Sequence, residues 1–483
     1  MSTGRFRRTR TLSLRVLIAA PQAVPRSFRL AVLALGVVGA VHGLVYVPFA
    51  GPRLGDTPSY TAPAQAIRNG SYSTPLPDVD VTALHIPESA QGALERQSYR
   101  TPGYPLLLAA TGFSGPGRPY LLIVVQAILT GIGVALLALT ARRLWGERAG
   151  LVAGALAALD PFPKHYVPRI LSEALAGSLV ALAVYAFVRA WQSRSAWWWA
   201  ATGLSTAALT LTRPLFALAV PLVVLGALVV RSWRGAAACA AACALLLGPW
   251  IAWEGDVAGK LTVSSFGEGW NLLIAAHGEG LHHTAAEVER SRAYVHDFVS
   301  VHRFAPSAAA LRRNHEAHPH YLARADAEQR RLAEHLYWKR LRHEPLTVLG
   351  EVAYRGYFLW MAHEDWVQPS WLLPLLRAAD WLTLVLAALG VALAIRLGGA
   401  GRALALFMVV FTLVNAVHHV EARYAMPVRG LYVAFVGLAL LTLWDRRQRR
   451  QEQRGDPEAR AREVAGRDQV RLRQPEHEPG HDR

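Results

Sequence analysis

Long apolar runs alternate with short loops that carry arginine along most of this chain. An α-helix needs about 20 apolar residues to cross the hydrocarbon core of a bilayer. Several runs approach or exceed that length, and the others are shorter but equally apolar. We predict membrane spans at residues 28–50, 119–141, 148–163, 168–190, 197–212, 213–231, 236–254, 372–397, 402–418 and 424–444. The pattern predicts an all-α polytopic membrane protein, a bundle of about 10 to 11 transmembrane helices with external loops.

The segment 102–118 is the uncertain member of this series. It has few apolar residues, and Pro102, Gly103 and Pro105 stand at its start. Irregular backbone is tolerated at membrane depth only where protein or a polar cavity surrounds it. We therefore expect this segment to dip into the membrane without crossing it.

The positions of the basic residues predict which side each loop faces. Arginine concentrates before the first run, in the loops ARRLWGER, RAWQSRS and RSWRG, and in the tail after Trp444. Positively charged loops stay in the cytoplasm. This places both ends of the chain inside, and it places the loop 51–101, the turn DPFPKHYVPR and the polar region after Trp253 outside. If 102–118 were a full span, every later loop would change sides.

Composition supports this interpretation. Of the 483 residues, 53% are hydrophobic and only 18% are charged, with a mean hydropathy of +0.21. Soluble domains carry about a quarter charged residues, so a soluble enzyme, a disordered chain and a single-anchor receptor are excluded. The net charge of +17 is explained by membrane orientation, and no nucleic-acid partner is expected.

These patterns divide the chain into five regions. They are a basic cytoplasmic N-terminus (1–27), an N-terminal transmembrane module with its external loop (28–254, loop 51–101), an external and interfacial region (255–371), C-terminal transmembrane helices (372–444) and a disordered cytoplasmic tail (445–483). Within the third region, residues 325–342 are predicted to be helical and residues 346–360 to lie at the membrane interface.

Unusual polar residues fall at the external ends of the spans, which predicts one external cavity. Asp56, in LGDTPSY, is the candidate general base, although Asp before Thr-Pro is also a common helix N-cap. Four cations are candidate phosphate ligands, and each one taken singly is also a plausible interfacial anchor. These cations are Arg100, Lys164, Arg213 and Arg423.

Glu173 needs a partner, because an ionisable residue at membrane depth is costly. An ion pair with Arg169 or Arg213 and a direct substrate contact are both open. The external histidines show no metal-ligand spacing, so no metal site or other cofactor is expected, and a divalent metal has no support. Cys239 and Cys243 are interpreted as small packing residues in a helix.

Ordered motifs resemble those of the GT-C membrane glycosyltransferases, especially bacterial relatives of protein O-mannosyltransferases and of the lipid A aminoarabinose transferase. The matching pieces run from about residue 45 to residue 440. They are GDTPSYTAPAQAIRNGSYS, YRTPGYPLLLA, ARRLWGERAGLVAGALAALDPF, LSEAL, LTRP, TVSSFGEGWNLLIA and EARYAMPV.

The resemblance implies transfer of a sugar from a polyprenyl-phosphate donor to an acceptor on the outer face of the cytoplasmic membrane. It implies that Asp56 is the catalytic base, that Arg100 and Tyr104 border the donor site, and that Arg423 and Tyr424 lie near the lipid phosphate. We expect attack by an acceptor hydroxyl with inversion at the sugar. The acceptor can be a glycan, a protein or a lipid. The remaining cavity-lining candidates are Tyr60, His165, Glu173, His419 and Glu421.

One departure from the family pattern concerns the residue after the base. Many relatives carry a second acid there, and this chain has Thr57, so the adjacent pair of carboxylates is not present at this position. A flippase or transporter for a lipid-linked sugar is the alternative function, since it would also need a cationic external cavity. Such a protein often has inverted repeats and ionisable groups in mid-span, and neither is evident in the sequence.

Overall fold

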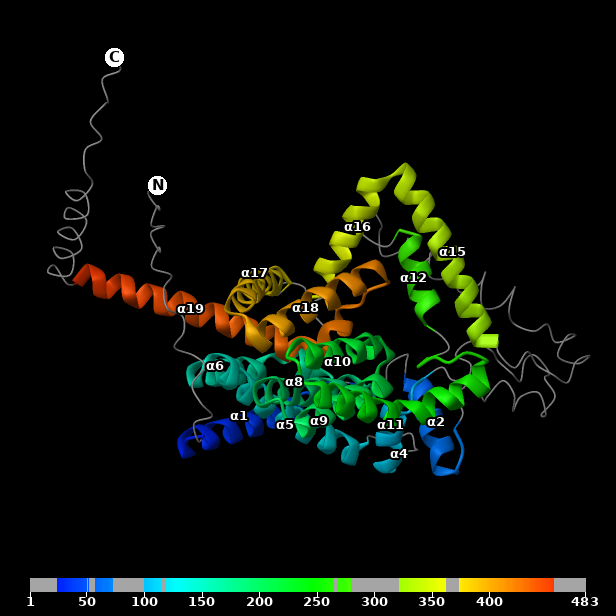
Figure 1. The fold of residues 1–483 in the computed structure, drawn as a ribbon, viewed down its shortest axis with the longest axis horizontal. Helices are drawn as coiled ribbons and strands as arrows, with labels where there is room; N and C mark the ends of the chain where they lie inside the picture. Colours follow the sequence, from blue (N-terminus) through cyan, green and yellow to red (C-terminus); the bar gives the residue numbers. More distant parts are fainter. Residues whose placement is uncertain are drawn as a thin grey trace, which may run out of the picture.

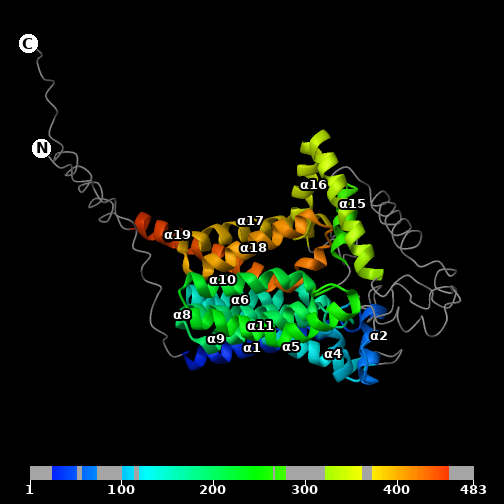
Figure 2. The ribbon, with the colours of Figure 1, turned by 45° about the vertical axis from the view of Figure 1, so that its right-hand side comes forward.

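The computed structural model describes residues 24–49, 51, 57–72, 100–113, 119–264, 267–278, 321–361 and 373–455. Within these ranges the regular structure is entirely helical. Long helices lie side by side in a bundle. The start of the first helix and the end of the last lie at one end of this bundle, and shorter helices gather at the other end (Figures 1 and 2).

The N-terminal part of the bundle contains seven α-helices and one 3₁₀ turn. They are α1 (Arg26–Val45), α5 (Tyr120–Trp145), α6 (Glu147–Leu159), α8 (Glu173–Ser193), α9 (Ala196–Thr212), η2 (Pro214–Leu218), α10 (Ala219–Val229) and α11 (Trp233–Ala258). Small residues let α1 and α5 approach closely, and a Cβ on Gly131 would lie 2.5 Å from the carbonyl oxygen of Gly36. Such contacts are typical of helix packing in lipid. Cys239 and Cys243 are buried and not disulfide-bonded, as expected for packing residues.

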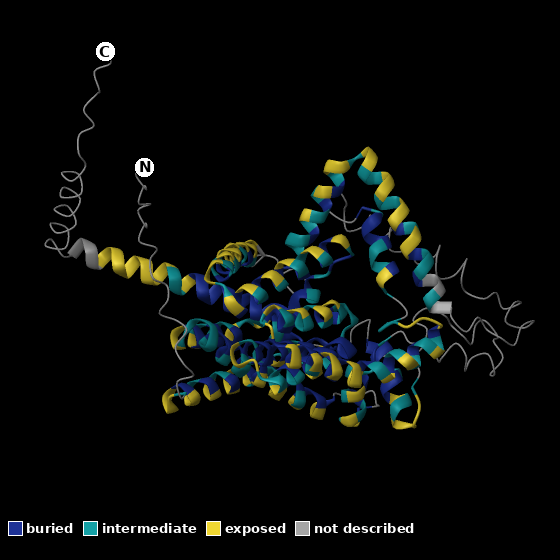
Figure 3. Cartoon of the chain, in the orientation of Figure 1, coloured by how far each residue is buried: buried dark blue, intermediate teal, exposed yellow. Residues whose placement is uncertain are grey.

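The C-terminal part adds α17 (Leu373–Leu397), α18 (Gly399–Val417), the 3₁₀ segment η6 (Ala422–Val428) and α19 (Arg429–Gly455). Helix α19 packs against α17 and α6, and so joins the two parts of the bundle. Its buried apolar residues, including Phe435 and Leu431, belong to the largest hydrophobic cluster of the protein. The outward faces of the bundle carry many exposed residues (Figure 3). Leu33 and Val37 are among the exposed apolar residues of the protein, as expected for a surface that meets lipid.

The helices confirm a multi-pass membrane protein. Among the described residues, seven helices are long and apolar enough to cross a membrane. The predicted spans 148–163, 197–212 and 213–231 correspond to shorter helices, α6, α9 and η2 with α10.

Two predicted boundaries between residues 148 and 190 were wrong. Helix α6 ends at Leu159 and α8 begins at Glu173, because Pro161, Pro163 and Pro168 disfavour continuous helix between them. The short helix α7 (Pro161–His165) fills part of the gap. Glu173 therefore lies at the first turn of α8 and not one turn inside a span.

The segment that begins at Pro102 does not span the membrane in the described residues. Its helix α4 (Gly103–Ala110) has eight residues, which is about 12 Å at the usual rise per residue. It packs against α2 (Thr57–Arg68) and against α9. The structure thus agrees with a segment that enters the bundle without crossing it.

Three more helices lie at the same end as α2 and α4 (Figures 1 and 2). They are α12 (Glu268–Ala276), α15 (Tyr321–His343) and α16 (Pro345–Phe358), and together they are called the head. Helix α12 packs on α15 around Leu273, Ile274 and Ala333. The predicted helix 325–342 is confirmed within α15.

The opposite end of the bundle is rich in arginine and is called the arginine-rich end. There Arg143, near the end of α5, donates a 3.2 Å hydrogen bond to Gln192, near the end of α8. Ser232, before α11, donates to the carbonyl of Arg194, after α8. The helix ends and loops at this end also carry Arg142, Arg148, Arg189, Arg231, Arg234, Arg396 and Arg402.

Candidate functional site

Segments far apart in the sequence meet beneath the head around Tyr60 of α2. The Tyr60 ring lies edge-on to Tyr104 of α4, with 5.1 Å between the ring centroids. Its hydroxyl is 3.3 Å from Ser172 Oγ, and the guanidinium carbon of Arg100 lies 4.5 Å from its ring centroid. Arg100 also donates a 2.9 Å hydrogen bond to Ser59. Tyr60 therefore connects α2 with Arg100, α4 and the start of α8.

Tyr104 forms a fixed wall of this region. It is fully buried, and its hydroxyl donates to Gln126 Oε1 of α5 at 3.1 Å. Gln126 in turn donates to the carbonyls of Val167 and Arg169 at 2.7 and 3.0 Å. The amide of Gln126 thus ties α4 to the irregular backbone that precedes α8.

Arg213 and Glu173 form a buried ion pair. Arg213 follows α9 and precedes Pro214, while Glu173 begins α8, and Arg213 Nη1 lies 2.9 Å from Glu173 Oε1. Their side chains are 13% and 3% exposed, and the N-terminus of α8 further favours the carboxylate. Glu173 is the partner of Arg213 Nη1. A guanidinium has five N–H donors, so those not directed at Glu173 can serve a ligand.

Arg423 and Tyr424 reach the same region from η6. The guanidinium carbons of Arg213 and Arg423 lie 5.9 and 6.0 Å from the Tyr424 ring centroid. Arg423 forms an ion pair with Glu421, and His419 Nε2 lies 3.5 Å from the other Glu421 oxygen. The His419 ring is edge-on to Tyr424. One chain of contacts thus joins Arg213 to His419.

The Glu421 carboxylate stays charged at neutral pH. Partial burial raises its pKa, but the hydrogen bond with His419 and the positive charge of Arg423 lower it further, and the result is a pKa of about 2. Glu421 is therefore negatively charged at neutral pH, and its ion pair holds the Arg423 guanidinium in place.

The arrangement favours binding of an anion. Arg100, Arg213 and Arg423, called the arginine cluster, bring three positive charges together, and Glu173 and Glu421 supply two negative ones. Arg213 interacts electrostatically with both Tyr60 and Arg423. Guanidinium groups match the oxygens of phosphate with paired hydrogen bonds. Nine of the predicted site residues meet here, namely Tyr60, Arg100, Tyr104, Glu173, Arg213, His419, Glu421, Arg423 and Tyr424.

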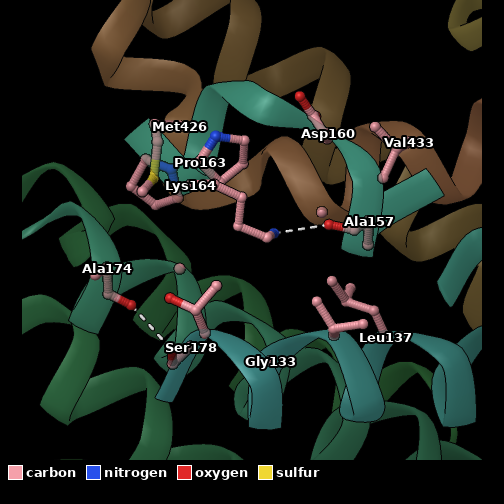
Figure 4. A pocket seen from close by; sticks show the side chains of 15 residues that line it. Gly133, Leu137, Ala157, Asp160, Pro163, Lys164, Ala174, Ser178, Met426 and Val433 are labelled. Carbon is pink, nitrogen blue, oxygen red and sulfur yellow. Dashed lines mark hydrogen bonds between the residues drawn. The ribbon is translucent and has the colours of Figure 1, made fainter. Parts of the chain in front are cut away.

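Lys164 lies apart from the arginine cluster. Its ammonium donates a 2.8 Å hydrogen bond to the carbonyl of Ala157 and borders a small pocket of about 50 Å³ (Figure 4). Lys164 is buried in α7, a single turn capped by Asp160, which accepts a hydrogen bond from the backbone NH of Phe162. No contact among the described residues joins Lys164 to Arg213 or Arg423.

His165 takes a different direction from Lys164. Its ring packs edge-on against Tyr46 of α1 and against Tyr166, with centroid distances of 5.9 and 5.5 Å. His165 thus faces α1. Its neighbour Tyr166 belongs to the same hydrophobic cluster as Tyr60.

Asp56, the candidate base, lies outside the described residues, and so do the acids of the loop 51–101. The external histidines considered as metal ligands, which are also outside them, are His282, His283, His315, His318 and His320. Thr57, the next residue, begins α2 and is buried, one helical turn before Tyr60. Among the described residues, no three His, Cys, Asp or Glu side chains gather as a metal site would require.

Sequence reasoning missed the uncharged polar residues that organise this region. Ser59, Gln126 and Ser172 contact Arg100, Tyr104 and Tyr60 respectively. Gln126 carried a signal, because it is a polar residue in a strongly apolar span. The two serines carried none, since serine is common both in loops and in membrane helices.

Comparison with protein families gives one match within the bundle. Residues 118–253, from α5 to α11, match a family described as dolichyl-phosphate-mannose-protein mannosyltransferase. A comparison with curated proteins finds no match.

Comparison with solved structures also gives matches. An oligosaccharyltransferase from Archaeoglobus fulgidus in the apo form is 14% identical, with a TM-score of 0.50 over 89% of this chain and 52% of that one. This chain therefore spans about half the length of that protein. The oligosaccharyltransferase AglB from Archaeoglobus fulgidus, in complex with an inhibitory peptide and a dolichol-phosphate, gives 11% identity, a TM-score of 0.45 and coverages of 90% and 53%. ArnT from Cupriavidus metallidurans bound to undecaprenyl phosphate gives 14% identity, a TM-score of 0.34 and coverages of 86% and 78%.

The similarity to GT-C membrane glycosyltransferases, which the sequence motifs indicate, is confirmed by the family match and by the archaeal fold. The predicted all-α polytopic fold is also confirmed.

Proposed function

We propose that this protein is a glycosyltransferase that moves a sugar from a polyprenyl-phosphate donor to an acceptor hydroxyl. The observation that carries the proposal is the convergence of Arg100, Arg213 and Arg423 at the head end of a membrane bundle. The family that matches residues 118–253 is named for a lipid-phosphate sugar donor, and a phosphate ligand is what such a cluster favours.

A groove that extends from Phe216 to Arg402 at the arginine-rich end has the chemistry to hold the lipid chain of the donor. It has a volume of about 380 Å³ and is lined mainly by apolar side chains of α8, α10 and α18. Leu225, Val229 and Leu406 on its walls are 53%, 62% and 49% exposed, so the groove opens toward the lipid. At its head end it includes Phe216, whose backbone NH donates to the carbonyl of Arg213 at 3.0 Å.

The groove and the cluster together suit one amphipathic ligand. The prenyl chain lies along α8, α10 and α18, and the phosphate reaches Arg213 and Arg423. The sugar then projects beneath the head. Lys164 borders a separate pocket, so in this arrangement it does not contact the phosphate and contributes only a positive charge at a distance.

The chemistry needs one base and stabilisation of a leaving phosphate. The acceptor oxygen forms a bond to the anomeric carbon as the bond from that carbon to the phosphate oxygen breaks on the opposite face, which inverts the configuration. The acceptor proton passes to Asp56, and the bonding electrons leave with the polyprenyl phosphate. The guanidinium groups stabilise the added negative charge.

The distribution of charge supports an outward-facing site. The arginine-rich end carries the basic loops, including Arg142, Arg148, Arg194 and Arg234, and such loops remain in the cytoplasm. The arginine cluster lies at the other end of the bundle. We therefore propose that sugar transfer occurs on the outer face of the cytoplasmic membrane.

The direct test incubates the purified protein in nanodiscs or vesicles with a radiolabelled polyprenyl-phosphate hexose and candidate acceptors. Label in a new product, with release of polyprenyl phosphate, supports the proposal. Movement of the intact donor between leaflets without bond cleavage would instead identify a flippase.

Arg423→Ala should raise the donor KM by about tenfold or more, because a charge-assisted hydrogen bond contributes about 1.5 to 3 kcal/mol. Arg148→Ala, which removes an exposed arginine at the other end of the bundle, is the matched control. Initial rates at varied donor concentration measure the effect. An unchanged donor KM in Arg423→Ala would remove this residue from the phosphate site.

Ala403→Phe should narrow the groove, since Ala403 lines it on α18. We expect the KM for a long-chain donor to rise severalfold, and the KM for a short-chain analogue to change much less, because only the long chain fills the groove. Val409→Phe, on an exposed face of the same helix outside the groove, controls for the added ring. Equal effects of the two substitutions on both donors would contradict the assignment of the groove.

A further inference from the structure

The head contacts the backbone that leads from α18 into η6, directly before Arg423. We infer that Tyr337 of α15 and Arg355 of α16 are positioning residues that set the location of Arg423 for the donor phosphate. The inference rests on the proposed function and adds to it a role for the head.

The first part of this connection holds the end of α18. The last carbonyl groups of a helix have no partner within the helix. Here Arg355 Nε donates to the carbonyl of Ala416 at 2.8 Å, and the Tyr337 hydroxyl donates to the carbonyl of Val417 at 2.6 Å. Arg355 Nη2 donates to the same hydroxyl at 2.9 Å, so the two residues act as one unit.

Burial and charge make this contact specific. Arg355 is 1% exposed, and its positive charge lies at the carbonyl end of α18, where the helix dipole favours a cation. A buried guanidinium requires its hydrogen bonds. Its geometry therefore fixes where α18 ends.

The second part holds the residues after α18. The backbone NH of His419 donates to the carbonyl of Asn271 in α12 at 2.8 Å. His419 then contacts Glu421, and Glu421 pairs with Arg423. Only a few residues thus separate the head contacts from the guanidinium of Arg423.

The helices of the head are also bound to one another. Asp326 of α15 accepts hydrogen bonds from the backbone NH groups of Gly267 and Gly269 at 2.8 and 2.9 Å. Arg340 of α15 donates to the carbonyl of Ala276 at 3.1 Å and to both oxygens of the buried Glu351 on α16. Because α12, α15 and α16 are linked in this way, their three contacts with residues 416–419 act together.

The consequence is a constraint on the donor site. Catalytic and binding groups must be held within a fraction of an ångström of the productive geometry. If the end of α18 shifts, the paired Glu421 and Arg423 shift with it, while Arg213, held by Glu173, does not. Loss of the Tyr337 hydroxyl should therefore weaken donor binding more than it slows the chemical step.

The test compares Tyr337→Phe with Tyr354→Phe in the full-length protein in nanodiscs. Both substitutions remove one hydroxyl and keep the ring. The Tyr354 ring contacts Tyr357 and Phe358 within α16, so it is the matched control. We expect Tyr337→Phe to raise the donor KM about fivefold or more, to change kcat less than about twofold, and to leave the acceptor KM unchanged. In a protein that already carries Arg423→Ala, Tyr337→Phe should raise the donor KM little further, because the arginine that Tyr337 positions is absent.

Hydrogen exchange of the backbone supplies a measurement that does not depend on activity. Amides of residues 415–424 should exchange faster in Tyr337→Phe than in the wild type, and not in Tyr354→Phe. Unchanged exchange, or faster exchange with an unchanged donor KM, would overturn the inference. If the wild-type protein neither binds nor uses the donor, the proposed function is overturned instead. Hydrogen exchange of residues 415–424 would still show whether the head holds that backbone in place.

Discussion

Asp56→Asn is expected to reduce sugar transfer by about 10² to 10⁴-fold, the usual contribution of a general base, without weakening donor binding. The amide has nearly the shape of the carboxylate but cannot take the acceptor proton. Thr57 begins α2, and Tyr60, one turn later, contacts Arg100 and Tyr104. In the sequence, Asp56 stands directly before Thr57 and four positions before Tyr60.

The measurement is single-turnover transfer from a labelled polyprenyl-phosphate sugar, together with equilibrium binding of the donor. Asp256→Asn is the control, because Asp256 is an exposed acid near the end of α11. If Asp56 serves only as a helix N-cap, its substitution should cost about 1 kcal/mol of stability or less and leave transfer intact. Retention of more than about a tenth of the wild-type rate would therefore reject the base assignment.

Asp160→Ala is expected to destabilise the folded protein by about 3 to 5 kcal/mol, the usual effect of removing one partner of a buried ion pair. Asp160 Oδ2 accepts a hydrogen bond from Arg429 Nε of α19 at 2.9 Å, and the two side chains are 8% and 7% exposed. The carboxylate also accepts from the NH of Phe162. Asp380 of α17 lies 4.0 Å from Arg429, too far to replace these contacts.

Thermal unfolding in nanodiscs, followed by intrinsic tryptophan fluorescence, measures the change. Glu147→Ala is the matched control, because Glu147 also pairs with an arginine, Arg142, at 3.1 Å, but is 49% exposed. Exposed ion pairs contribute about 0 to 1 kcal/mol. If both variants unfold at the same temperature, the Asp160–Arg429 pair does not hold α19 against the N-terminal part of the bundle.

The candidate site was partly predictable because some of its residues are unusual where they stand. Arg213 and Glu173 lie at the ends of apolar runs, where an ionisable residue is costly, and both were identified. The sequence left three possibilities for Glu173, and the structure selects Arg213 as its partner. Lys164 carried the same signal, but its ammonium donates to the carbonyl of Ala157 and borders another pocket.

The head illustrates what pattern alone does not contain. The sequence predicted a helix over 325–342, but it gave no reason to connect Tyr337 or Arg355 with the end of α18. Their hydrogen bonds to Val417 and Ala416 depend on the angle between three helices and on where α18 stops. The role of Asp56 stays a prediction.

By itself, the sequence determined that the chain crosses the membrane many times, where most helices lie and which loops carry the positive charge. Those properties are local, because the length of an apolar run and the charge of its flanking loop act directly on insertion. Only the tertiary structure brings Arg100 to Tyr60 and both Arg213 and Arg423 to Tyr424, and directs Lys164 to the carbonyl of Ala157. Such convergence depends on how α2, α8, η2 and η6 pack, and helix packing is set by side chains that are distant in the sequence.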